Sequence, residues 1–219
     1  MYRFYIDNPL KIGEILTIPK DELHHMKKVM RVQSEEKIEI VNGKGDIAIG
    51  KFANEITLIS KTHSPPDPYK KILALANPLQ NHLEIIIEKG TELGISDFIL
   101  FPSVKSPIRK FSDAKKNRCK KISISSIKQC KRLYLPKISF INSPENLPAA
   151  TYYLGDPNGT FPSIKQKSDI AFIIGPESGF TKEETSYFTE ITKAIPTKLS
   201  DNILRCETAA IISSYLLNS

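Results

Sequence analysis

The spacing of apolar positions changes about one third of the way along the chain. Residues 1–62 contain short extended runs in which apolar and polar positions alternate, and one stretch, Glu22–Arg31, with helical spacing. The runs that read as strands are Tyr2–Ile6, Glu14–Ile18, Lys37–Val41, Ile47–Phe52 and Ile56–Ser60. Several short strands with one helix predict a small β-barrel.

A proline-rich segment ends this pattern. His63–Pro68 has three prolines in six residues, which can extend neither a helix nor a central strand. We therefore expect a linker here, with one domain at residues 1–65 and a second at residues 70–219.

After the linker, strand and helix patterns alternate. Expected strands are Lys71–Ala76, Phe98–Phe101, Asp169–Ile174 and Ala194–Leu199. Expected helices end at Gly94, begin near Ser112, and cover Lys182–Thr192 and Arg205–Leu217. Asp169–Ile174 is apolar throughout its centre, as in parallel sheets covered on both faces. The pattern predicts an α/β doubly wound fold.

The charge balance suggests a polyanionic partner. Of 219 residues, 31 are Lys or Arg and 24 are Asp or Glu, which gives a formal net charge of +7. The expected helix and its flanks at Lys110–Arg132 carry basic residues against the single acid Asp113. Nucleic acid is the partner that such a basic stretch favours, and a solvated helix face is the alternative.

Cysteine usage and hydropathy favour a cytoplasmic protein without a resident metal. The three cysteines form no C-x-x-C spacing, and the four histidines lack zinc-type companions. No apolar run approaches the roughly 18–20 residues that span a bilayer. Met1–Asp7 has no apolar segment of the signal-peptide type.

Two strand–loop–helix junctions carry the candidate chemistry. In the first, a buried strand runs into a Gly/Pro loop, Gly175–Phe180, and Thr181 with Glu184 forms a capping box. Such loops lie where open α/β sheets bind ligands, although a tight turn without a ligand has the same pattern. The second junction, Leu199–Ala210, places Arg205 at a helix start, where a cation opposes the macrodipole. A ligand-binding role and an ordinary surface arginine both remain open.

Motifs of other enzyme classes are missing. The chain has no Walker A motif and no G-x-S-x-G elbow, which disfavours P-loop ATPases and α/β-hydrolases. The nearest G-x-G, Gly43–Gly45, lies in an expected hairpin and no helix follows it.

Both junctions resemble the signature loops of the ribosomal RNA uridine-N3 methyltransferases, members of the SPOUT superfamily of trefoil-knotted methyltransferases. The matching segments are Gly175–Phe180 and Ile203–Ala209. Three shorter stretches resemble family motifs in the same order: His25 with Val29–Arg31, Lys89–Gly94, and Gln129–Arg132 followed by Pro136. The resemblance spans nearly the whole chain.

The resemblance implies methylation of N3 of a uridine in small-subunit (16S) ribosomal RNA, with S-adenosylmethionine as cofactor. It implies a PUA-like RNA-docking barrel at residues 1–65, a knotted α/β domain at residues 70–219, and a homodimer. The residues it assigns to the cofactor are Leu154, Gly175, Pro176, Glu177, Gly179, Leu199, Ser200, Ile203, Leu204 and Arg205.

On the same basis, Arg205 is our candidate for stabilising charge on the base. Glu177 or Glu207 could assist proton removal, or could hold a loop by hydrogen bonding. The candidate RNA-binding residues are Arg31, Lys105, Arg109, Lys120, Lys121, Lys128, Gln129 and Arg132.

The chain departs from the family pattern at four places. Ser178 and Ser200 stand where glycine is usual, Asn202 replaces a basic residue, and Lys105-Ser106 replaces Arg-Ser. Two alternatives therefore stay open. One is a SPOUT methyltransferase with another target, such as a ribose 2′-hydroxyl. The other is a non-catalytic RNA-binding or ribosome-assembly protein with a spoiled cofactor site.

Overall fold

The computed structural model describes residues 1–17, 26, 28, 32–53, 55–164 and 167–219. The chain divides into two compact units. One consists of Met1–Pro66 with Ile127–Leu135, and the other of Asp67–Ser126 with Pro136–Ser219. Most of the helix expected at Glu22–Arg31, including His25 and Arg31, lies outside the described residues.

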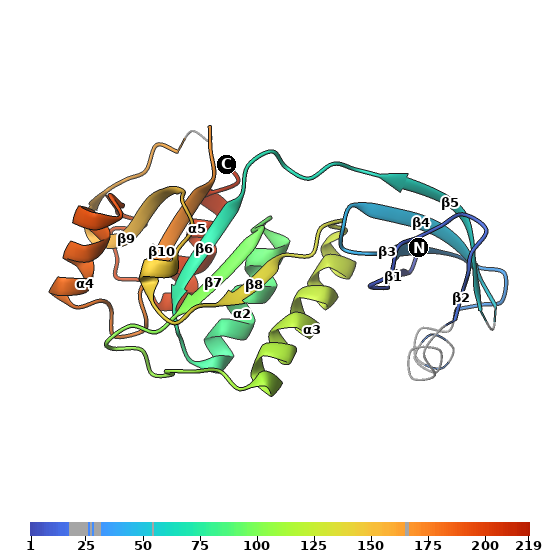
Figure 1. The fold of residues 1–219 in the computed structure, drawn as a ribbon, viewed down its shortest axis with the longest axis horizontal. Helices are drawn as coiled ribbons and strands as arrows, with labels where there is room; N and C mark the ends of the chain where they lie inside the picture. Colours follow the sequence, from blue (N-terminus) through green and yellow to red (C-terminus); the bar gives the residue numbers. More distant parts are fainter. Residues whose placement is uncertain (18–25, 27, 29–31, 54, 165–166) are drawn as a thin grey trace. The chain divides into compact units, whose positions relative to one another are not determined.

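The first unit is built on a five-stranded sheet with the order β1-β3-β4-β5-β2 (Figure 1). Its strands are β1 (Arg3–Tyr5), β2 (Ile15–Leu16), β3 (Lys37–Val41), β4 (Asp46–Phe52) and β5 (Ile56–His63). β1 pairs with β3 in parallel, and the other pairs are antiparallel. Side chains at alternate strand positions fill one core: Phe4, Leu16, Ile38, Ile40, Ala48, Phe52, Ile56 and Leu58. This alternation is why the strands could be read from sequence.

The turn between β3 and β4 explains why Ile127–Leu135 belongs to the first unit. Asn42 Oδ1 closes the turn by accepting the backbone N–H of Lys44 at 2.8 Å. The turn's backbone then pairs with the distant segment: Leu135 N donates to Gly43 O at 2.9 Å, and Gly45 N donates to Leu133 O at 3.1 Å. Because these segments lie so far apart in the chain, the sequence near either of them does not predict the pairing.

The second unit is built on a six-stranded sheet with the order β11-β9-β10-β6-β7-β8, in which every pair is parallel (Figure 1). Its strands are β6 (Lys71–Ala76), β7 (Asp97–Phe101), β8 (Lys137–Phe140), β9 (Thr151–Thr160), β10 (Ile170–Ile174) and β11 (Ile195–Thr197). All five residues of β10 are buried, which agrees with its position inside the sheet. The expected α/β fold with a parallel sheet and a small β unit is confirmed.

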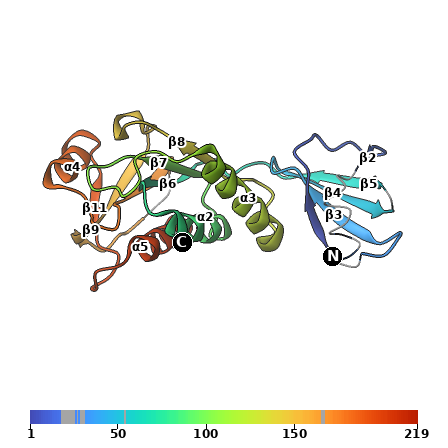
Figure 2. The same cartoon turned by 90° about the horizontal axis from the view of Figure 1, so that it is seen from below.

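Helices cover both faces of this sheet. α2 (Gln80–Glu92), α3 (Asp113–Cys130) and α5 (Cys206–Leu216) contribute to one apolar core, and Figure 2 shows α2 beside α5. On the other face, α4 (Lys182–Ser186) leads into the single π-turn η3 (Tyr187–Ile191), whose Phe188 packs in a second core. A short 3₁₀ turn, η2 (Pro144–Asn146), precedes β9.

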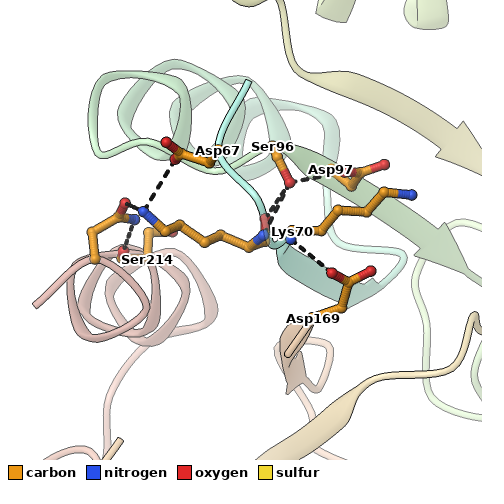
Figure 3. Close-up of polar contacts among 8 residues, drawn as sticks. Asp67, Lys70, Ser96, Asp97, Asp169 and Ser214 are labelled. Atoms are coloured by element: carbon orange, nitrogen blue, oxygen red, sulfur yellow. Dashed lines mark hydrogen bonds and ion pairs between the residues drawn. The ribbon is translucent and has the colours of Figure 1, made fainter. Parts of the chain in front are cut away.

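A network of polar contacts joins the strands at their amino ends (Figure 3). Lys70 N donates to Asp169 Oδ1 at 2.9 Å, which links β6 to β10. Lys71 N donates to Ser96 Oγ at 3.0 Å, and Ser96 Oγ lies 2.8 Å from Asp97 Oδ2, which links β6 to β7. The backbone N–H groups of Lys70 and Lys71 at this end of the sheet are therefore hydrogen-bonded within the protein.

Two strands and one helix differ from the sequence expectations. β8 and β9 were not expected, and in β9 the segment Gly155–Gly159 has the composition of a turn. The expected helix at Lys182–Thr192 is instead α4 followed by η3. The hydroxyls of Thr185 and Thr189 donate to carbonyls four residues earlier, a contact that distorts helices.

Candidate active site

A pocket of about 800 Å³ opens at the carboxyl ends of β9 and β10. Its volume is in the range of small-molecule and cofactor sites. Three chain segments supply most of its wall: Leu154–Asn158 on β9, Ile174–Lys182 after β10, and Leu199–Leu204 before α5. Thr185, Ser186, Cys206 and Ala209 complete the lining. This is the edge of a parallel sheet at which ligands are expected.

β9 contributes by bulging out of the sheet. Leu154 pairs with Pro196 on β11, but the next pair joins Thr160 to Thr197, so Gly155–Gly159 leave the ladder. A Cβ on Gly159 would lie 2.5 Å from backbone atoms of Pro196, so only glycine lets β9 pass β11 here. The bulge carries Asp156 and Asn158 into the pocket wall.

The loop after β10 forms a tight turn, in which Gly179 N donates to Pro176 O at 2.8 Å. Gly179 has φ +67°, and a Cβ there would meet no atom within 4 Å. Ser178 is not among the described residues with positive φ, so its side chain adds no strain of that kind. The expected capping box is present: Glu184 N donates to Thr181 Oγ1 at 3.2 Å, and Thr181 N donates to Glu184 Oε2 at 2.9 Å.

The segment that follows β7 holds this loop from the side. Lys105 Nζ lies 3.4 Å from Ser178 O and 3.3 Å from Phe180 O. Val104 N donates to Glu184 Oε1 at 2.7 Å. Arg109 donates to Val104 O at 3.0 Å and so fixes the segment itself. Lys105 and Arg109, which the sequence suggested as RNA-binding residues, thus make contacts inside the protein.

Glu177 turns from the pocket loop toward the start of α2. Its Oε1 accepts the backbone N–H of Leu79 at 3.0 Å and lies 2.7 Å from His82 Nδ1. Burial by itself would raise the pKa of Glu177, but hydrogen bonds from Leu79, from its own backbone and from His82 outweigh burial, so the pKa lies below its usual value. A carboxylate held in its charged form is a weak proton acceptor.

The second loop leads into α5. Ser200 Oγ accepts the backbone N–H of Asn202 at 3.1 Å, so this serine closes a local turn. Ile203 is 89% exposed at the rim of the pocket. Arg205 is the N-cap residue of α5 and its side chain makes no capping bond. Arg205 is exposed and, unlike its neighbour Leu204, does not line the pocket.

Glu207 and Cys206, in the first turn of α5, lie close to Glu177. Glu207 Oε2 is buried and accepts no hydrogen bond from the described residues; His82 Nδ1 is 3.8 Å away. Burial raises the pKa of the Cys206 thiol to about 12, and the charges of Glu177 and Glu207 add to the effect. The thiol therefore stays protonated at neutral pH.

The pocket gathers most of the cofactor residues that the resemblance implies. Those in its wall are Leu154, Gly175, Pro176, Glu177, Gly179, Leu199, Ser200, Ile203 and Leu204. Sequence reasoning missed Gly155–Asn158, because β9 was not recognised, and His82, because it has no motif of its own. The rule that ligands lie at the carboxyl ends of strands would have found the β9 residues.

The remaining RNA candidates lie along α3 and just after it. Lys120, Lys121 and Gln129 are exposed, whereas Lys128 and Arg132 are half-buried. Lys120 and Arg132 also have partners within the protein.

Within the part of the chain that the structure describes, no group of three His, Cys, Asp or Glu side chains could hold a metal ion. The same residues include no helix both long and apolar enough to cross a membrane.

A pocket at the carboxyl edge of a parallel sheet is typical of α/β proteins that bind a ligand there, and the family comparisons give the class, RNA methyltransferases. Residues 65–218 match the RNA methyltransferase domain family, and residues 18–61 match the RNA methyltransferase PUA domain family. The chain belongs to the ribosomal RNA small subunit methyltransferase E family.

Individual relatives are similar over their full length. The chain is 32% identical to ribosomal RNA small subunit methyltransferase E 1 of Borreliella burgdorferi, covering 97% of this chain and 94% of the relative. It is 28% identical to ribosomal RNA small subunit methyltransferase E of Buchnera aphidicola from Acyrthosiphon pisum, covering 99% and 92%. A crystal structure of the Neisseria gonorrhoeae enzyme bound to S-adenosylmethionine shares the fold, with a TM-score of 0.86, 24% identity, and coverage of 99% and 96%.

Proposed function

We propose that this chain transfers a methyl group from S-adenosylmethionine to N3 of a uridine in small-subunit ribosomal RNA. The observation that carries the proposal is the pocket of about 800 Å³ whose walls are the two loops that resemble the family's signature loops. The names of the relatives support the ribosomal RNA substrate. The position N3 rests on the resemblance of these loops.

The pocket residues fit S-adenosylmethionine. Gly175 and Gly179 let the backbone approach a flat adenine ring closely, and the backbone N–H and C=O groups beside them can bond to its edge. The apolar side chains of Leu154, Leu199 and Leu204 offer the ring contact surface. When bound, S-adenosylmethionine supplies an electrophilic methyl group, so no metal is required.

The protein's part in the reaction is to prepare N3. This nitrogen is a poor nucleophile while it carries its proton, so the site must accept the proton or stabilise the resulting anion. We assign Arg205 to stabilising negative charge on the base, since this exposed residue follows the pocket residue Leu204 and directly precedes α5. For Glu177, the bonds to Leu79 and His82 support the loop-holding role over proton removal. For Glu207, the described contacts favour neither proton removal nor the loop-holding role.

We assign RNA binding to the basic side chains of α3 and to an N-terminal domain at residues 1–65. The methyltransferase domain is assigned to residues 70–219. Lys121 and Lys128 lie seven residues apart on α3 and so share one side of the helix, with Lys120 adjacent to Lys121, which suits contacts to phosphates. Reversing these three charges should lower RNA affinity by about tenfold or more at low salt and weaken its dependence on salt. Unchanged affinity in a filter-binding assay would leave α3 as a solvated surface helix.

We expect a homodimer as the assembly and the cytoplasm as the location, which a ribosomal RNA substrate supports. Leu79, Ile85 and Tyr215 expose apolar side chains on or beside α2 and α5, two helices that pack together in one core. Light scattering on the purified protein tests this assembly, and a monomer at all concentrations would exclude it. The trefoil knot stays a prediction.

Calorimetric titration with S-adenosylmethionine tests the cofactor, and we expect micromolar affinity. A methylation assay on small-subunit RNA, followed by digestion to nucleosides and mass spectrometry, then tests the position. N3-methyluridine supports the proposal. A 2′-O-methylated nucleoside would identify another target, and a folded protein without cofactor binding would remove the enzyme assignment.

A further inference from the structure

One side chain outside the pocket wall contacts a residue of the loop after β10 and a residue at the start of α5. His82 lies in the first turn of α2, with only 19% of its side chain exposed. Its Nδ1 is 2.7 Å from Oε1 of Glu177, on the loop after β10, and 3.8 Å from Oε2 of Glu207, at the start of α5. Three separate elements of the fold thus meet at one imidazole.

The contact geometry indicates that His82 Nδ1 carries a proton. Glu177 is ionised, because its pKa is held below the usual value, and an ionised carboxylate can only accept hydrogen bonds. His82 Nδ1 must therefore carry a hydrogen and donate it to Glu177. A hydrogen bond to an ionised carboxylate is stronger than one between neutral groups.

Glu207 adds a second carboxyl group beside His82. Its Oε2 is buried, accepts no hydrogen bond from the described residues and lies 3.8 Å from His82 Nδ1. His82 therefore lies between the hydrogen-bonded Glu177 and a Glu207 oxygen that has no described hydrogen bond of its own.

We infer that His82 is a positioning residue for the cofactor pocket, which holds Glu177 against α2 by donating a hydrogen bond to it. Through Glu177, His82 fixes the turn Pro176–Gly179, and its contact with Glu207 supports the start of α5 just after the second loop. His82 itself does not line the pocket, so it acts through these two residues. The inference rests on the proposed binding of S-adenosylmethionine.

Three substitutions at this position separate the hydrogen bond from the shape of the side chain. His82→Ala should weaken S-adenosylmethionine binding by about tenfold, because Glu177 loses the donor that holds it. His82→Phe keeps a ring without a donor and should bind as weakly as His82→Ala. His82→Gln keeps an N–H donor, so we expect affinity within about threefold of wild type in the same calorimetric titration.

His63→Ala is the matched control. This substitution also removes an imidazole–carboxylate contact, His63 Nδ1 to Asp46 Oδ1 at 2.9 Å, but in the N-terminal unit. Cofactor affinity should be unchanged in this variant. Thermal unfolding of each variant verifies that it is folded, and if His82→Ala is not, the pair His82→Phe and His82→Gln carries the test.

The possible outcomes separate this inference from the function on which it rests. Weak binding by His82→Ala or His82→Phe with rescue by His82→Gln supports the positioning role. Wild-type affinity in folded His82→Ala, or His82→Gln as weak as His82→Phe, overturns it and leaves the proposed function intact. Wild type that does not bind S-adenosylmethionine overturns the proposed function first.

Discussion

The two ends of the six-stranded parallel sheet carry opposite arrangements of polar groups. At the amino ends, Lys70, Lys71 and Ser96 bond to neighbours within the protein and tie the strands together. At the carboxyl ends, a bulge and two loops surround a pocket of about 800 Å³. The amino end is arranged for stability, whereas the carboxyl end keeps groups available for ligands.

The difference has a topological cause. In a parallel sheet every strand enters at one edge and leaves at the other, so the loops that follow the strands meet at a single edge. Short connections at the amino edge can bond to one another. The bulge of β9 and the loops after β10 and β11 instead surround a cavity. The comparison implies that substitutions at the carboxyl edge change function, while those at the amino edge change stability.

The largest expected effect is at the carboxyl edge. Arg205→Ala should lower turnover by about 100-fold or more, because a donor aimed at developing charge is lost, while affinity for S-adenosylmethionine stays the same. Single-turnover methylation and calorimetry measure the two quantities. Arg205→Lys keeps the charge and should recover part of the rate. Full turnover by Arg205→Ala with unchanged cofactor affinity would show that Arg205 has no catalytic role.

Next in size is a pair of glycine substitutions. Gly179 and Gly13 both have positive φ, and a Cβ on either would meet no atom within 4 Å. Alanine at each position should cost about 1 kcal/mol of stability through backbone strain alone. Only Gly179→Ala should also weaken S-adenosylmethionine binding, by about fivefold at a cost of about 1 kcal/mol. Equal affinities for the two variants would mean that the Gly179 turn does not shape the pocket.

A smaller effect is expected at the amino edge. Ser96→Ala removes the acceptor of the Lys71 N–H and should lower the free energy of unfolding by about 1 kcal/mol without changing cofactor affinity. Urea denaturation and calorimetry measure these effects, and exposed Ser125→Ala on α3 is the control that should lose no stability. A drop in cofactor affinity for Ser96→Ala would contradict the assignment of stability to the amino edge and of ligand binding to the carboxyl edge.

The smallest effect concerns thiol reactivity. Burial raises the pKa of Cys119 to about 11, and burial with nearby carboxylates raises that of Cys206 to about 12, so neither forms thiolate at pH 8. Iodoacetamide at pH 8 should therefore modify the half-buried Cys130 first, as read by peptide mass spectrometry. Early modification of Cys206, which lines the pocket, would show that the carboxyl edge opens more than the structure indicates.

Much of the fold followed from local pattern. β3 and β6 lie where alternation or a continuous apolar run placed them, and α2 ends at Glu92, just before Gly94 at φ +95°. The capping box of Thr181 and Glu184 was also visible in the sequence. β9 was missed because Gly155–Gly159 has turn composition, and its strand character comes from pairing with β10 and β11 rather than from its own residues.

The amino-acid sequence by itself determined the order of strands and helices, the loops with candidate chemistry and the family, because these depend on residues close together in the chain. Tertiary structure alone decided which distant groups meet. It brought Asp156 to the pocket wall, joined Leu133–Leu135 to the turn at Gly43, and set His82 between Glu177 and Glu207. Contacts of this kind arise from packing between separate elements, and no spacing along the chain encodes them.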